Sequence, residues 1–77
     1  LLILTMNLEI YLFWTDENGQ RQHVIKNHPN WTGAIPRLNE YLVYEGIKEA
    51  YNVEIVRHDF DRKLVSISAE FLPGFFG

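Results

Sequence analysis

The chain has 77 residues, no cysteine and a formal net charge of −3 at pH 7, so residues 1–77 have room for a single domain. Without cysteine there can be no disulfides, and only three histidines remain to hold a structural zinc ion, so we expect no metal and no cofactor. The basic residues are scattered rather than gathered into a stripe, which argues against nucleic acid as a partner.

The N-terminal stretch is apolar, but it lacks the basic residues and the cleavage site of a signal peptide. Leu1–Trp14 is too short to cross a bilayer and is interrupted by polar residues, so no membrane association is expected. Met6 offers an alternative start of translation. Residues 1–6 are therefore a candidate leader or non-native stretch.

A β-hairpin is predicted around Asn18-Gly19, the preferred residue pair of a two-residue type I′ turn. Apolar and polar residues alternate on both sides of this turn. With a two-residue loop, the expected cross-strand pairs are Leu12 with Ile25, Phe13 with Val24, Trp14 with His23 and Asp16 with Arg21. This pairing places Tyr11, Phe13 and Val24 on the face of the sheet opposite Leu12.

A helix is predicted next, with Thr32 as its N-cap and Pro36 in its first turn. The residues expected to face inward are Ile35, Leu38, Leu42 and Val43. Two ends are open: Gly46 is a natural C-terminal glycine, or the helix continues through Ala50 and stops at Asn52. We favour the longer helix, because Ile47 and Ala50 keep the helical spacing.

A second hairpin is predicted between residues 53 and 72, with a three-residue loop at Phe60–Arg62. Val53 and Ile55 are expected to face the core, which places Val56 on the opposite face. Pro73 and Gly74 then take the apolar tail, residues 73–77, out of the sheet.

The order hairpin, helix, hairpin predicts an α+β fold in two layers, ββαββ, with one helix packed on one face of an antiparallel sheet. The β-grasp arrangement has this order, and the likeness is one of topology only.

The face of the sheet not covered by the helix is the predicted interaction surface. Its residues, together with those of the tail, are Tyr11, Phe13, Val24, Val56, Phe75 and Phe76. We expect this surface to contact protein, either a second copy of the chain in a homodimer or another protein.

No motif of residues predicts catalysis. His58, Asp59 and Asp61 lie close together and are weak candidates for a metal or acid–base site, but aspartates are also common in turns.

The hypothesis is therefore a non-catalytic interaction or regulatory module that associates with itself in the cytoplasm, a reducing compartment that suits a cysteine-free chain. One alternative is a small enzyme or ligand-binding protein whose site lies between protomers and uses His23, His58 or Asp59. A second alternative is binding of single-stranded nucleic acid through Tyr11, Phe13 and Trp31.

Overall fold

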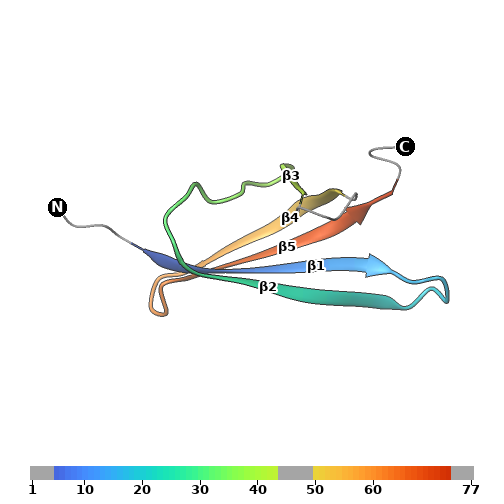
Figure 1. Cartoon of the computed structure of the whole chain (residues 1–77), viewed down its shortest axis with the longest axis horizontal. Coiled ribbons are helices and arrows are strands. Elements are labelled where there is room, and N and C mark those ends of the chain that lie inside the picture. Colours follow the sequence, from blue (N-terminus) through green and yellow to red (C-terminus); the bar gives the residue numbers. More distant parts are fainter. Residues whose placement is uncertain (1–4, 44–49, 74–77) are drawn as a thin grey trace.

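The computed structural model describes residues 5–43 and 50–73. This part of the chain forms one sheet of five strands and contains no helix (Figure 1). The strands are β1 (Met6–Thr15), β2 (Arg21–Trp31), β3 (Tyr41–Val43), β4 (Ala50–Asp59) and β5 (Leu64–Leu72). Their order across the sheet is β2-β1-β5-β4-β3.

The sheet is built from two antiparallel hairpins that join side by side. β1 pairs with β2 and β4 pairs with β5, as the alternation of residues predicts. The two hairpins meet where β1 and β5 run parallel, with Leu8 opposite Val65 and Leu12 opposite Ala69. Short β3 pairs with the outer edge of β4 and completes a mixed sheet.

The predicted helix is wrong wherever the structure describes it. Residues 32–40, here called the crossover, run without regular structure from the end of β2 to the far edge of the sheet (Figure 1). Asn39 has a φ of 68°, which no residue within a right-handed helix adopts. The chain then joins the edge of β4. The amide of Asn39 donates to the carbonyl of Val53, and the amide of Val53 donates to the carbonyl of Glu40, each at 2.9 Å. The favoured end of the helix is also wrong, because Ala50 and Asn52 lie in β4. The alternative end at Gly46 lies outside the described residues.

The α+β, two-layer fold class is therefore wrong, and the described chain is all-β. The apolar residues of this segment have helical spacing, but the conformational preferences of its individual residues oppose a helix. Pro36 and Asn39 disfavour a helix, whereas Tyr41 and Val43 are strong strand formers. The two hairpins of the β-grasp-like order are present, but an extended crossover takes the place of the helix.

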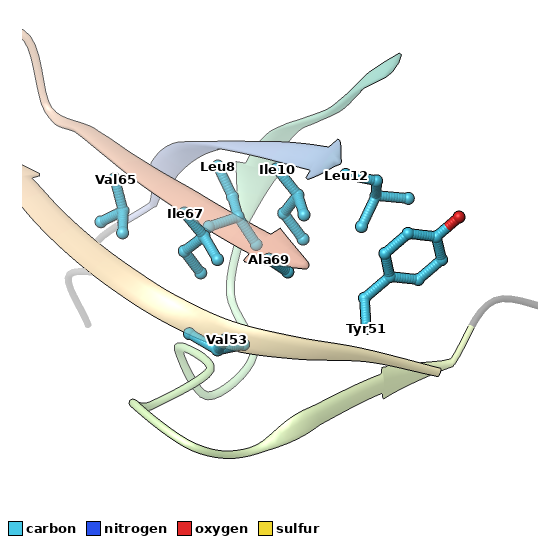
Figure 2. Packing of buried hydrophobic residues seen from close by; sticks show 8 residues of the cluster. All are labelled: Leu8, Ile10, Leu12, Tyr51, Val53, Val65, Ile67 and Ala69. Atoms are coloured by element: carbon cyan, nitrogen blue, oxygen red, sulfur yellow. The ribbon is translucent and has the colours of Figure 1, made fainter. Parts of the chain in front are cut away.

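The hydrophobic core lies on one face of this curled sheet, the core face (Figure 2). Its buried members are Leu8, Ile10, Leu12, Tyr51, Val53, Val65, Ile67 and Ala69. Ile35 from the crossover and Leu42 from β3 pack against it, so curling of the sheet and an irregular segment cover the apolar face that the helix was expected to cover.

The start of the crossover is held by Trp31. Its indole Nε1 donates a hydrogen bond to the carbonyl of Ala34 at 3.1 Å, and its ring packs partly buried against the core. A Cβ at Gly33 would lie only 2.9 Å from this ring. The close approach of the indole therefore requires glycine at that position.

The first hairpin has a three-residue loop, Glu17–Gly19, and not the predicted two-residue type I′ turn. The amide of Gly19 donates to the carbonyl of Asp16 at 3.0 Å, and Gly19 alone in this loop has a positive φ, of 79°. A type I turn followed by a left-handed residue is a common loop of this length. The extra residue shifts the pairing by one, so Leu12 faces Val24 and Phe13 faces His23.

The carboxylate of Asp16 organises this loop. The amides of Gln20 and Asn18 each donate to its Oδ1 at 2.9 Å, and the side chain of Gln22 donates to its Oδ2 at 3.0 Å. These hydrogen bonds, led by the one from Gln20, favour the ionised form and hold the pKa of Asp16 below its usual value.

Replacement of Gly19 by valine is expected to lower the free energy of unfolding by about 1–2 kcal/mol, because a β-branched residue resists positive φ. No atom lies within 4 Å of the added Cβ, so the cost comes from the backbone and not from a clash. Urea denaturation measures it. Asn18→Ala is the matched control and should change stability little, whereas a type I′ turn would make both substitutions costly.

The second hairpin has a four-residue loop, Phe60–Lys63, instead of the predicted three, with Lys63 at a φ of 52°. Farther from the loop the predicted pairing holds, with Val53 opposite Ala69. A β-bulge at Glu54 absorbs the difference between the two ends of the hairpin. Beyond this bulge, Val56 turns to the core face and Ile55 turns away from it.

Candidate functional site

The face of the sheet opposite the core, here called the outer face, is assigned by strand pairing, because residues directly opposite each other lie on the same face. Its central members are Glu9, Tyr11 and Phe13 of β1, Arg21, His23 and Ile25 of β2, Ser66, Ser68 and Glu70 of β5, Asn52, Ile55 and Arg57 of β4, and Tyr41 of β3.

Three rings form a cluster on the β1–β2 half of the outer face. The centroids of Tyr11 and Phe13 are 6.5 Å apart with nearly parallel planes. The ring of His23 lies 5.3 Å from Phe13 and 6.4 Å from Tyr11. This aromatic cluster is half-exposed and belongs to adjacent strands, so backbone hydrogen bonds hold it in place. Such rigid rings lose little conformational entropy when a partner covers them.

Arg21 closes one end of the aromatic cluster. Its guanidinium carbon lies 4.4 Å from the centroid of Phe13, within cation–π distance. Its Nη2 also lies 2.9 Å from Oε2 of Glu70 on β5. That oxygen is shielded from solvent and accepts no well-aligned hydrogen bond among the described residues, so the contact is mainly electrostatic. Arg21 therefore neutralises the carboxylate nearest to the rings.

The apolar residues of the β4–β3 half of the outer face are more exposed than Tyr11 and Phe13. The side chain of Ile55 is 57% exposed and that of Tyr41 is 52% exposed. Large apolar side chains that stay exposed on the outer face are Ile25, Tyr41, Val43 and Ile55. Grouping on one face is typical of a contact surface, whereas single scattered apolar residues need no explanation.

The predicted interaction residues divide between the two faces. Tyr11 and Phe13 lie on the outer face, opposite Leu12, as expected. Val24 pairs with Leu12 and lies on the core face, at its edge. Val56 also lies on the core face, where it packs partly buried against the core. The remaining two predicted residues, Phe75 and Phe76, lie outside the described residues.

The aromatic and aliphatic residues of the outer face that escaped prediction are His23, Ile25, Tyr41, Val43 and Ile55, and Tyr41 and Val43 belong to the segment predicted as helix. His23 and Ile25 reach it because the three-residue loop shifts β2 by one residue, and such a shift exchanges the faces of a whole strand. Ile55 reaches it through the bulge at Glu54. The Asp16–Gly19 segment is equally compatible with a three-residue loop, so the first shift had a signal in the sequence. The bulge had none.

The candidate metal or acid–base residues do not converge. His58 pairs with Val65 on the core face, whereas Asp59 pairs with Leu64 on the outer face. Asp59 accepts a hydrogen bond from the amide of Arg62 at 3.1 Å and so caps the loop. Within residues 5–43 and 50–73, no group of three His, Asp or Glu side chains could hold a metal ion.

A shallow hollow of about 400 Å³ lies between the crossover and β4. It is lined by Ile35, Pro36, Arg37, Leu38, Val56 and His58. The ionisable side chains at its rim are Arg37 and His58, and Arg37 already contacts Glu40 at 3.7 Å. The hollow lacks the converging polar groups that a catalytic site requires.

Comparison with protein-family models, curated proteins and solved structures yields no match. Among the described residues, no helix is long and apolar enough to cross a membrane. The function must therefore be argued from the outer face itself.

Proposed function

We propose that this chain is a non-catalytic interaction module that forms a homodimer through its outer face. The observation that carries the proposal is the aromatic cluster of Tyr11, Phe13 and His23, which shares one exposed face with Ile25 and Ile55. The core lies on the other face, so these side chains contribute nothing to it. Their burial against a partner would remove apolar surface from water.

Protein is a better partner for this face than nucleic acid. Trp31, the third aromatic residue of the nucleic-acid hypothesis, packs against the core and does not join Tyr11 and Phe13. Glu9 lies on the outer face beside the rings, has no ion pair within the described residues and would repel phosphates. The cysteine-free composition suits the cytoplasm, where we propose that the module acts.

Sedimentation equilibrium tests the proposal. The native chain should show a mass near twice its 9.1 kDa at high micromolar concentration. Phe13→Lys should return it to the monomer mass, because a charge would be buried among apolar groups. Ile55→Lys on the other half of the face should act in the same way, which covers the case in which loss of the Phe13 ring disturbs folding.

Phe60→Lys is the matched control. Phe60 is 87% exposed in the β4–β5 loop, away from the outer face, so its replacement should leave the dimer intact. Circular dichroism verifies that each variant is folded. A folded native monomer at high micromolar concentration, or a dimer that survives both Phe13→Lys and Ile55→Lys, would refute the proposal.

A further inference from the structure

Opposite charges flank the middle strand on the outer face. Glu9 of β1 and Arg57 of β4 both pair with Ser66 of β5, so the three residues form one row across the sheet. Adjacent strands lie about 4.8 Å apart, which separates Glu9 from Arg57 by about 10 Å. Neither side chain has an ion-pair partner within the described parts of the chain.

The next row repeats this asymmetry with apolar side chains. Tyr11 and Ile55 both pair with Ser68 of β5, so a ring lies on one side of the middle strand and an aliphatic group on the other. The middle strand itself carries only small hydroxyl side chains in these two rows. Each half of the outer face therefore complements the opposite half in charge and in shape.

We propose that the occupant of the outer face is a second copy of this chain, related by a twofold axis that runs parallel to β5 above Ser66 and Ser68. This inference rests on the proposed function and specifies its geometry. Such an axis exchanges β1 and β4, so Glu9 of each copy meets Arg57 of the other. The same operation packs Tyr11 of each copy against Ile55 of the other.

The charges select this axis over its alternative. A twofold axis across the strands would place β1 over β1 and β4 over β4, and β1 carries no basic residue that Glu9 could meet. Packed sheets cross at about −30°, which tilts this axis by about 15° from β5 and keeps the rows near the crossing point opposite each other. The Glu9 and Tyr11 rows both lie at Ser66 and Ser68, where the axis passes.

The neighbouring charges do not oppose this arrangement. Asp59 lies two residues from Arg57, but its carboxylate is held by the guanidinium of Arg62, with Nε at 3.6 Å. Glu70 is close to the axis and approaches its own counterpart, but Arg21 neutralises it. Of the outer-face charges in residues 5–43 and 50–73, Glu9 and Arg57 therefore remain for the second copy to pair.

The contact is expected to be small. The proposed axis centres the contact on the three middle strands of the sheet, β1, β5 and β4. Three strands cover an area about 14 Å wide and about 20 Å long. This is below the standard interface of about 800 Å² per partner, so we expect a dissociation constant in the micromolar range.

Charge reversal tests the geometry. Glu9→Arg and Arg57→Glu should each weaken the homodimer about tenfold or more, because both symmetric contacts become repulsive. An equimolar mixture of the two variants should dimerise about as tightly as the native chain, because each copy then offers the charge that the other lacks. Sedimentation velocity of each variant alone and of the mixture measures both effects.

Attraction between opposite net charges cannot explain pairing of the two variants in the mixture. The native charge of −3 becomes −1 in Glu9→Arg and −5 in Arg57→Glu, so both variants remain negative. Glu17→Arg, in the exposed β1–β2 loop, changes the net charge equally without touching the outer face and should leave the dimer unchanged. If one single variant fails to fold, the double variant Glu9→Arg/Arg57→Glu should still form a homodimer.

The outcomes separate this inference from the proposed function. A native dimer that Phe13→Lys dissociates, but that forms unchanged in both charge variants, keeps the outer face and overturns the twofold axis. Single variants that dissociate but do not pair when mixed, and a double variant that stays monomeric, overturn it equally. A native monomer refutes the proposed function before the charges are tested.

Discussion

Truncation of Leu12 to alanine should lower the free energy of unfolding by about 3–5 kcal/mol. Leu12 is fully buried in the middle of β1, between Val24 and Ala69 of the adjacent strands. The truncation removes apolar burial and leaves a cavity that a hydrogen-bonded sheet cannot collapse to fill. A domain of this size has a total stability of about 4–12 kcal/mol, so the variant should be partly or wholly unfolded.

Leu38→Ala is the matched control, since it makes the same chemical change on the crossover. Leu38 is 58% exposed there, although the predicted helix would have buried it. Its truncation should change stability by less than about 0.5 kcal/mol. Urea denaturation measures the free energy of unfolding of both variants. Equal losses of stability at Leu12 and Leu38 would contradict the observed core.

Proline at Ser68 should be similarly disruptive, with a loss of about 3 kcal/mol or more. Ser68 lies in β5, which pairs with β1 on one side and β4 on the other, so its amide cannot be removed without loss of a ladder hydrogen bond. The proline ring would also separate the two hairpins at the strand that joins them. Thermal unfolding followed by circular dichroism measures this effect.

Glu17→Pro provides the comparison for that substitution. Glu17 is the second residue of the type I turn, where proline has the preferred φ, and its amide donates no turn hydrogen bond among the described residues. We expect no loss of stability from this variant. A Ser68→Pro chain that melts at the native temperature would show that β5 is not the central strand.

Sequence reasoning reached the parts of the fold that depend on local pattern. Alternation of apolar residues identified both hairpins, and the Asn18-Gly19 pair located the first turn. It could not reach the parallel pairing of β1 with β5, because these strands are far apart in the chain and no local signal links them. The helix was wrong because apolar residues at helical spacing can equally line an irregular segment, as Ile35 does.

Part of the candidate site could also be predicted from the local alternation of residues. Tyr11 and Phe13 alternate with buried Leu12 whatever the loop length, so their face followed from the sequence. Val24 required the correct register, and Val56 required knowledge of the bulge at Glu54. A single residue inserted in a loop or strand exchanges the two faces beyond it, and its energetic cause is tertiary packing rather than local preference.

Isotope-filtered nuclear Overhauser spectroscopy shows whether the outer face meets a second copy of itself. In an equimolar mixture of ¹³C-labelled and unlabelled native chains at millimolar concentration, we expect intermolecular contacts between the Tyr11 ring and the Ile55 methyl groups. Intermolecular contacts confined to the β2 edge, for example at Val24, would contradict it, as would a folded chain with no intermolecular contacts at all.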